Sequence, residues 1–372
     1  MNKVVLQYKN WLIIGVLIVT AGAFAYALHT SFNKPTKAEA LQAIIDKDYN
    51  KALSGFQKLY LSGDKSAGYY LYNLISGPSH YGKEIKGFIS KEEKAKACKY
   101  LISAVEANYT KAQFELASQL GGLSSDCLKP QNAEEERFKL LTKASEQGYI
   151  PAQESLGIIY EGKKDFEKAK YWWRKAGDAG SADGQYMLAK QLLAESEQDK
   201  SKIQEAIKYF KLSAVKREKK DYPTWREEVE FAMNEGVGLA SSEFLGFIYG
   251  FGYLVEQNTD ESIKYFNKSI NTDLKNKENA ERLIKLSFVF KGGYSNIDTN
   301  VVSPESRYLF NLSMLIPNLI GKNGMELIQN KSNPELAYLL LSKASDLGST
   351  KAIYLQAMMN INHGAVVAKV NA

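Results

Sequence analysis

The residue types that most often carry out chemistry are scarce in this chain of 372 residues, which has three histidines and two cysteines. The histidines are His29, His80 and His363, and no two of them have the i, i+4 spacing of a helical metal site. The sequence contains none of the GxxxxGK[ST], GxGxxG or GxSxG patterns that mark phosphate-binding loops, dinucleotide-binding loops and serine nucleophiles. We therefore predict no catalytic residue, no metal and no cofactor.

Two groups of charged residues are better explained by a position at the end of a helix than by a catalytic role. Glu134, Glu135 and Glu136 stand where a helix is expected to begin, and the positive end of the helix dipole stabilises acidic side chains there. A basic run contains Lys208, Lys211, Lys216, Arg217, Lys219 and Lys220. We interpret this run as a solvated helix end, with contact to a membrane surface or an acidic protein as the alternative.

The N-terminal segment predicts a contact with a membrane. Residues 11–28 read WLIIGVLIVTAGAFAYAL, and no charged residue occurs between Asn10 and Asn33. As a helix this segment rises about 27 Å, close to the roughly 30 Å hydrocarbon core of a bilayer. Residues 1–33 are either an uncleaved signal-anchor or a signal peptide cleaved near Ala25-Tyr26-Ala27. We favour the anchor because the apolar run is long, and both interpretations place the rest of the chain outside the cytoplasm.

The composition supplies a hydrophobic core and excludes several classes of protein. The chain is 45% hydrophobic and 12% aromatic with 8 prolines, which argues against a mainly disordered protein. Its 48 basic and 42 acidic residues give a net charge of +6, too small to indicate nucleic-acid binding. Two cysteines can form at most one bridge, so a disulfide-dense scaffold is excluded.

A spacing of small residues recurs along the chain and predicts pairs of antiparallel helices. LLTKASEQGYIPA at 140–152 recurs as LLSKASDLGSTKA at 340–352, and in both an Ala is followed after four residues by Gly and after four more by Ala. Gly148 is placed to end one helix in the left-handed conformation, and Ala152 opens the next helix and allows a close approach. Such a pair cannot bury its faces alone, so neighbouring pairs must stack. Further copies are Ala176-Gly180-Gly184, Ala232-Gly236-Ala240, Ala104-Asn108-Ala112 and Leu59-Gly63-Ala67.

The stretch AQESLGIIYEGKKDFEKAKYWWRKAGDAGSADGQYMLA at 152–189 resembles the SEL-one-like repeat, a relative of the tetratricopeptide repeat. That family's unit is an AQxxLGxxYxxG helix followed by a KAxxWxxKAxxxG helix, and residues 152–180 match it almost position for position. The resemblance implies an all-α fold, a right-handed α-solenoid of antiparallel helix pairs over residues 34–372, preceded by the N-terminal membrane or signal helix. We expect the clearest repeats at 96–195, 200–270 and 333–360, and divergent or inserted segments at 77–95, 215–230 and 291–332.

The two cysteines lie near helix ends that antiparallel packing would bring together. Cys98 is near the start of an expected second helix, and Cys127 lies just past the end of the following first helix. An oxidising compartment would allow a bridge, whereas the alternative is two unpaired thiols. Proteins of the resembled family usually place paired cysteines within one helix pair at short spacing, and this pair departs from that pattern. We favour the bridge.

Helical solenoids expose a surface lined by the first helix of each pair. Side chains on these first helices that are not expected to pack between helices are therefore candidates for contact with a partner. These candidates are Tyr69, Tyr70, Asn73, Gln113, Gln153, Glu154, Gln185, Tyr186 and Tyr354.

The resemblance implies a non-enzymatic scaffold or adaptor that binds another protein in the cell envelope. Alternative hypotheses are an immunity protein that neutralises a secreted toxin and, with less support, a hydrolase of cell-wall material. We expect a monomer anchored in the bacterial inner membrane through residues 11–28, with the repeats in the periplasm, a protein partner and no nucleic acid. If residues 1–33 are cleaved, the protein would be periplasmic or secreted.

Overall fold

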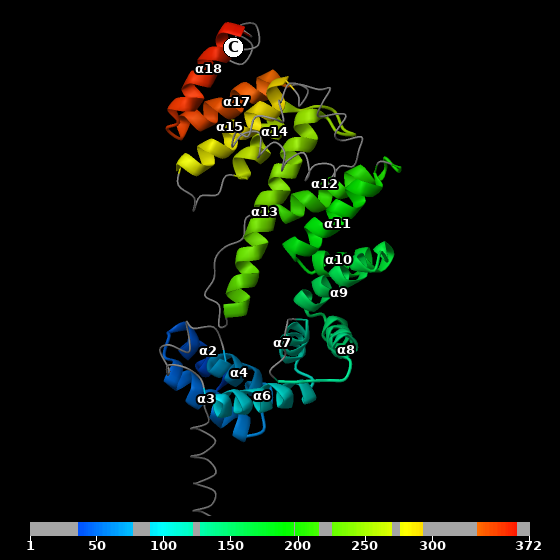
Figure 1. Ribbon diagram of the computed structural model, residues 1–372, viewed down its shortest axis with the longest axis vertical. Helices are drawn as coiled ribbons and strands as arrows, with labels where there is room; N and C mark the ends of the chain where they lie inside the picture. Colours follow the sequence, from blue (N-terminus) through cyan, green and yellow to red (C-terminus); the bar gives the residue numbers. More distant parts are fainter. Residues whose placement is uncertain are drawn as a thin grey trace, which may run out of the picture. The chain divides into compact units, whose positions relative to one another are not determined.

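The computed structural model describes residues 36–76, 90–121, 127–196, 198–215, 225–269, 276–292 and 333–362 (Figure 1). Within these ranges all regular secondary structure is helical, and they contain no strand. The chain forms two compact units, residues 1–144 with 221–228 and residues 145–220 with 229–372. The predicted continuity of the array over residues 34–372 stays a prediction.

The predicted membrane segment at residues 11–28 and all three histidines lie outside the described residues. Across the described part of the chain, no helix combines the length and the apolar composition that spanning a membrane requires.

Unit 1 is a series of helices that pack in chain order: α2 on α3, α3 on α4, α4 on α6 and α6 on α7. Local chemistry sets two of their starts, because Thr36 with Glu39 and Ser90 with Glu93 form reciprocal capping boxes at α2 and α6. The helices are α2 (Lys37–Ile45), α3 (Tyr49–Leu61), α4 (Ala67–Ser76), α6 (Lys91–Glu106), α7 (Thr110–Leu120) and α8 (Ala133–Glu146), the last of which extends just into unit 2.

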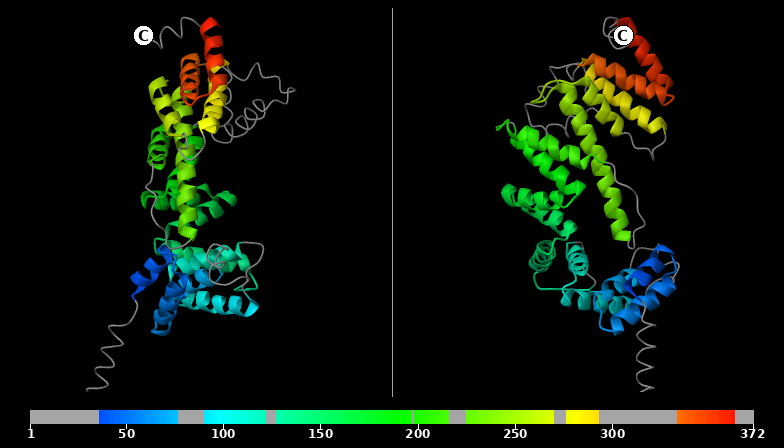
Figure 2. Two further views of the ribbon diagram at one scale, coloured as in Figure 1. Left: turned by 90° about the vertical axis from the view of Figure 1, so that its left-hand side faces the viewer. Right: turned by 180° about the vertical axis from the view of Figure 1, so that it is seen from behind.

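Unit 2 repeats the same arrangement, with α9 packed on α10, α10 on α11 and α11 on α12. Farther along the chain, α17 packs on α14, α15 and α18, and α17 and α18 lie side by side in both views of Figure 2. The helices are α9 (Ile150–Gly162), α10 (Phe166–Asp178), α11 (Ala182–Glu195), α12 (Lys202–Ser213), α13 (Trp225–Phe251), α14 (Thr259–Lys268), α15 (Asn276–Gly292), α17 (Pro334–Asp346) and α18 (Thr350–Asn362); residues 225–228 at the start of α13 belong to unit 1.

The turns between paired helices have the backbone conformation that the small-residue spacing predicts. Gly148 has φ +83° between α8 and α9, and Gly180 and Gly348 have φ +96° and +88° at the equivalent turns. Asn108 adopts φ 60° at the turn between α6 and α7, a conformation that asparagine tolerates better than most side chains. These helix ends were predicted correctly, because they depend on residues adjacent in sequence.

One predicted helix end is wrong. The skeleton Ala232-Gly236-Ala240 predicts a turn at Gly236, but α13 continues from Trp225 through that glycine to Phe251. A single glycine within a helix costs only about 1 kcal/mol relative to alanine, and no proline stands in this segment to interrupt the helix. The glycine is therefore tolerated inside a helix of 27 residues.

Glycines on first helices receive aromatic side chains from the second helices that follow. A Cβ built on Gly157 of α9 would lie 2.1 Å from Nε1 of Trp173 on α10, whose side chain is 1% exposed. Likewise, a Cβ on Gly246 of α13 would lie 2.7 Å from the ring of Phe266 on α14. The missing side chain is what allows the indole or phenyl ring to fill the interface.

Candidate functional site

Most of the first-helix side chains that we predicted to face a partner are instead buried between helices. Six of the nine candidates are at most 6% exposed and therefore offer almost no surface to another molecule. These six are Tyr69, Tyr70, Asn73, Gln113, Gln153 and Gln185.

The buried amides bond to the chain itself. Gln153 Nε2 donates to the carbonyl oxygen of Ser145 at 3.1 Å, and Gln185 Nε2 donates to that of Gly177 at 2.8 Å. Each acceptor lies eight residues upstream, in the last turn of the preceding helix, where carbonyls lack partners within the helix. In unit 1, Gln113 Nε2 donates to the side chain of Asn108 at 2.7 Å. The glutamine of the repeat motif thus ties successive helices together.

The two buried tyrosines of α4 belong to an aromatic cluster that holds a lysine. The hydroxyls of Tyr70 and Tyr109 are 3.0 Å apart, and the Lys37 ammonium lies 5.4 and 5.0 Å from the centres of these two rings. Lys37 Nζ also donates to Ser66 Oγ at 2.7 Å. Burial lowers the pKa of Lys37, and the nearby Asp64 carboxylate opposes that shift. This lysine is a component of the packing in unit 1.

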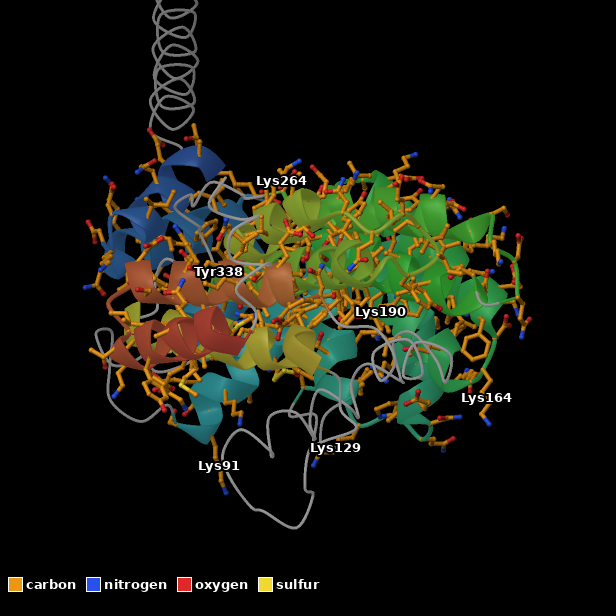
Figure 3. All side chains as sticks on the ribbon, turned by 90° about the horizontal axis from the view of Figure 1, so that it is seen from above. Lys91, Lys129, Lys164, Lys190, Lys264 and Tyr338 are labelled. Carbon is orange, nitrogen blue, oxygen red and sulfur yellow. A yellow bond between two sulfur atoms is a disulfide. The ribbon has the colours of Figure 1, made fainter. Side chains whose placement is uncertain are left out.

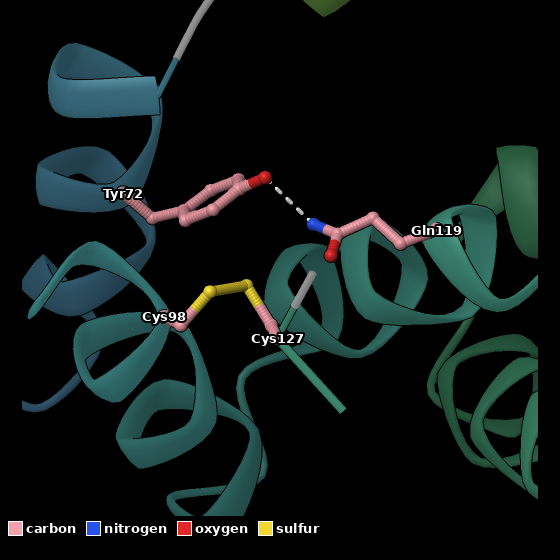
Figure 4. The surroundings of a disulfide bond; sticks show 4 residues. All are labelled: Tyr72, Cys98, Gln119 and Cys127. Atoms are coloured by element: carbon pink, nitrogen blue, oxygen red, sulfur yellow. Dashed lines mark hydrogen bonds between the residues drawn. A yellow bond between two sulfur atoms is a disulfide. The ribbon is translucent and has the colours of Figure 1, made fainter. Parts of the chain in front are cut away.

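Cys98 and Cys127 form a disulfide in this structure, with their Cα atoms 4.9 Å apart (Figure 4). The bridge joins α6 to the segment that follows α7, so it closes the α6–α7 hairpin across 29 residues. Gln119 Nε2 on α7 donates to Tyr72 Oη on α4 at 2.7 Å beside it. The disulfide thus fixes the α6–α7 hairpin, and the hydrogen bond from Gln119 joins α7 to α4.

Three candidates retain access to solvent. Tyr354 on α18 is 64% exposed. Glu154 on α9 accepts a short hydrogen bond from the Ser181 hydroxyl, which also caps α11 by accepting from the backbone of Gly184. Tyr186 on α11 is half-buried, and no described residue forms a hydrogen bond with its hydroxyl.

The ring of Tyr186 is held by aromatic neighbours from two other helices of unit 2. Its centroid lies 6.0 Å from that of Phe210 on α12 and 5.9 Å from that of Phe244 on α13. Phe210 and Phe244 stack on each other at 5.4 Å. The phenol is consequently fixed in position and its hydroxyl is carried at a defined point of the surface.

Charged groups from three helices surround this tyrosine. Burial raises the pKa of Tyr186 to about 12, with further contributions from the carboxylates of Asp183 and Glu243. Glu243 is bonded by the Arg282 guanidinium of α15, with contacts of 2.7 and 3.3 Å. Lys190 places its ammonium 5.7 Å from the Tyr186 ring centre (Lys190 is labelled in Figure 3).

Asp183 was not among the predicted site residues. It lies in the first turn of α11, where the sequence offers the ordinary explanation of an acid at a helix start. In the structure, burial raises the pKa of its carboxyl, and Lys190 opposes the shift. The desolvation comes from tertiary packing, so no short-range sequence signal indicates it.

Several large apolar side chains are also exposed on the helices. Ile158 on α9 is 52% exposed, and Ile353 next to Tyr354 on α18 is 53% exposed. Within the described ranges, no group of three or more His, Cys, Asp or Glu residues could hold a metal ion. Exposed apolar side chains therefore lie on both α9 and α18.

Stacked antiparallel helix pairs with a shared turn and a shared glutamine contact define this protein as an α-helical repeat protein. The family model "Sel1 repeat" matches five segments, residues 110–149, 150–181, 182–214, 241–271 and 323–349. The chain therefore contains Sel1 repeats, which confirms the predicted family. Such repeats generally mediate protein–protein interactions and are typically non-catalytic.

Two solved structures are similar to this chain. One is the crystal structure of a Sel1 repeat protein from Oxalobacter formigenes, with 17% identity, a TM-score of 0.46 and coverage of 74% of this chain and 97% of that chain. The other is a protective antigen present in uropathogenic Escherichia coli strains that displays an SLR fold, with 16% identity, a TM-score of 0.37 and coverage of 83% and 66%. A search among curated proteins gave no match.

Proposed function

We propose that this protein is a non-enzymatic scaffold that binds another protein at the exposed faces of its repeats and is tethered in the bacterial cell envelope. The Sel1 repeats support the binding role, because repeats of this kind generally mediate protein–protein interactions. The partner is a protein rather than a nucleic acid, since the net charge is only +6.

The proposal rests on one observation: large apolar side chains remain exposed after the repeats have packed against one another. In the α9–α10 hairpin, Gly157 and Trp173 fill the interface and Gln153 bonds to the chain. Ile158 on the same first helix is nevertheless 52% exposed. A large apolar side chain on a helix held rigid by its neighbours suits an interaction site, because its burial against a partner is favourable and costs little ordering.

Two features support an envelope location. The disulfide between Cys98 and Cys127 is of the kind that persists in oxidising compartments such as the bacterial periplasm. The uncharged segment at residues 11–28 is suited to anchor the chain in the inner membrane. We propose a single-pass protein with its repeats in the periplasm, and protease should digest the repeats in spheroplasts while leaving them intact in whole cells.

Site-specific photo-crosslinking in the native envelope tests the binding role. A photoreactive amino acid at Ile158 should yield a discrete crosslinked protein. The same amino acid at Glu167 of α10, whose side chain is 86% exposed, is the matched control and should yield none. Absence of a specific product from Ile158, or identical products from both positions, would contradict the proposal. Capture of a secreted toxin would favour an immunity protein, and capture of wall fragments would favour a hydrolase.

A further inference from the structure

Lysines and tyrosines from α12, α13 and α14 come together on the surface of unit 2. The ammonium of Lys211 on α12 lies 5.5 Å from the ring centre of Tyr249 on α13. Tyr249 stacks on Tyr265 of α14, with the ring centroids 5.9 Å apart and the ring planes 7° from parallel. Lys264 and Lys268 of α14 lie 5.5 and 5.3 Å from the ring centre of Tyr265 (Lys264 is labelled in Figure 3). We call these five residues the lysine–tyrosine patch.

The lysine–tyrosine patch holds more positive than negative charge. Glu261 bonds Lys264 at 2.5 Å, and its carboxylate also attracts Lys211. Neither Lys211 nor Lys268 forms an ion pair with any residue in the described part of the chain. The positive charges of Lys211 and Lys264 repel each other, although they come from different helices. An anionic group brought to the patch would offset this repulsion and would be attracted by all three lysines.

The tyrosine rings position the lysines without occupying their hydrogen-bond donors. The face of an aromatic ring attracts a cation but supplies no carboxylate or carbonyl oxygen, so the ammonium groups of Lys211 and Lys268 can still donate to an acceptor. All three lysines are exposed, whereas Tyr265 is only 5% exposed and is therefore held by the packing. A lysine that already lies against a fixed ring loses less freedom when it binds than a lysine that moves freely in solvent.

Apolar side chains border the lysine–tyrosine patch on α12. Leu212 and Val215, which follow Lys211 in the chain, are 41% and 58% exposed. Cations beside exposed apolar groups suit contact with a protein, because protein interfaces combine buried apolar area with polar contacts. Clusters that bind anionic membranes typically hold about four to eight basic residues, whereas this patch holds three and one of them is bonded by an acid.

The positive charge is a local feature of these helices. Three lysines stand against one glutamate in α12, whereas α9 carries two glutamates and no basic residue. An acidic ligand would therefore be attracted to α12 more strongly than to the first helix that carries Ile158.

We propose that the lysine–tyrosine patch binds an acidic segment, rich in glutamate or aspartate, of the protein that this chain binds. Carboxylates of the segment accept charged hydrogen bonds from Lys211, Lys264 and Lys268, and its apolar side chains cover Leu212 and Val215. This inference rests on the proposed binding function and adds the chemistry of the partner.

Peptide binding to the full-length chain in a non-ionic detergent tests the patch. The probe is a peptide of three Gly-Leu-Glu units that carries an uncharged dye, and its neutral twin replaces glutamate with glutamine. Fluorescence anisotropy at about 0.15 M salt limits attraction between distant charges. We expect the acidic peptide to bind at least about tenfold more tightly than its twin. Equal binding of the two peptides would overturn the proposal.

Two triple variants separate the patch from the net charge of +6, which itself favours an acidic peptide. Lys211→Gln, Lys264→Gln and Lys268→Gln together should reduce the preference for the acidic peptide below about threefold. The control combines Lys51→Gln, Lys58→Gln and Lys99→Gln, which removes as much charge from exposed positions of unit 1 and should keep the preference within about twofold. Equal losses in the two variants would show attraction by net charge alone and would overturn the proposal.

A third variant distinguishes binding from a structural role of the lysines. Arginine at positions 211, 264 and 268 keeps the positive charges and should keep the preference, and its loss there would overturn the proposal. The glutamine variant should melt within about 2 °C of the unaltered chain, because exposed ion pairs contribute little to stability. A larger decrease would show that the lysines serve the packing and would also overturn the proposal.

A lipid headgroup offers the same negative charge and is tested by competition. Dihexanoyl-phosphatidylglycerol should displace the acidic peptide only at concentrations well above those at which the unlabelled peptide does so. Displacement at a lower concentration than the peptide requires would assign the patch to lipid and overturn the proposal.

The failure of this inference and that of the proposed function are distinguishable. Equal binding of the two peptides, while the crosslinker at Ile158 still captures a protein, would remove this inference alone. A preference that depends on the patch, without any captured protein, would remove the proposed scaffold role alone.

Discussion

The two units of this protein differ in the contacts that a half-buried charged group makes. In unit 1 the ammonium of Lys37 lies over the rings of Tyr70 and Tyr109 and donates to Ser66. In unit 2 the carboxylate of Asp183 has no such partner among the described residues. Burial shifts the pKa of each group toward its neutral form, downward for the lysine and upward for the acid. The first charge is bonded within the packing of its unit, whereas the second has no hydrogen bond or ion pair to its carboxylate among the described residues.

The units also differ in what holds their hairpins together. Unit 1 has a covalent bridge between Cys98 and Cys127. The α9–α10 hairpin of unit 2 relies on the close fit of Trp173 over Gly157. One unit should therefore respond to the redox state of its surroundings, and the other should respond only to changes in shape.

The largest effect is expected from removing the bridge. Cys98→Ser combined with Cys127→Ser should destabilise unit 1 by about 3.5 kcal/mol, from the chain entropy of the loop that the disulfide closes. Amide hydrogen exchange should show faster exchange in residues 90–121 and no change in residues 150–193. Reductant should reproduce the effect in the unaltered chain and do nothing to the double variant. Equal acceleration in both units would contradict the distinction drawn here.

A side chain added at the glycine of the α9–α10 hairpin should produce the next largest effect. Gly157→Val places atoms where the buried indole of Trp173 lies, and overpacking of this kind costs up to about 3 kcal/mol. The control is Gly162→Ala at the end of α9, where a Cβ meets nothing within 4 Å, and stability should change by less than about 1 kcal/mol. Urea denaturation measures both. Similar losses in the two variants would show that helix propensity, not the fit to Trp173, is responsible.

The sequence predicts the helix pairs and their turns because these depend on residues close together in the chain. The glycine at 148 and the asparagine at 108 have the positive φ that the spacing requires. The same reasoning fails at Gly236, where local spacing resembles a turn but the helix continues. A glycine permits the left-handed conformation without enforcing it, so the surrounding helix decides.

The candidate site could be predicted only in part. Gln153 and Gln185 look like free polar groups on a first helix, but their acceptors are carbonyls of the preceding helix that folding brings within reach. Tyr186 was predicted to face a partner, and it retains access to solvent. Asp183 was missed because the feature that distinguishes it, the desolvation of its carboxyl by burial, arises only when the helices pack. Desolvation is a tertiary property and leaves no local sequence pattern.

Replacing the lysine of unit 1 should have a moderate, destabilising effect. Lys37→Ala removes the cation from the two tyrosine rings, the bond to Ser66 and the buried aliphatic stem, for a loss of about 1–2 kcal/mol. Lys58→Ala on α3 is the matched control, because Lys58 is exposed and should contribute only about 0.3 kcal/mol. Denaturant unfolding of the two variants gives the comparison. An unchanged or increased stability in Lys37→Ala would mean that the cost of desolvating Lys37 exceeds its contacts.

The smallest expected effect is a gain in stability, in the variant Asp183→Asn, and its size should depend on pH. The folded pKa of Asp183 is raised above its usual value of 3.8, so protonation favours the folded state and the unaltered chain loses stability as pH rises through that pKa. Asp183→Asn has no such titration and should be the more stable protein at pH 7. The difference in melting temperature between the two chains should shrink as pH falls toward 3.8. Lys190 on the same helix, Glu243 on α13 and Arg282 on α15 are common to both chains, so their titration largely cancels in the difference. A difference that stayed constant between pH 4 and pH 7 would show that Asp183 is already satisfied in the free protein, and the contrast with Lys37 would then disappear.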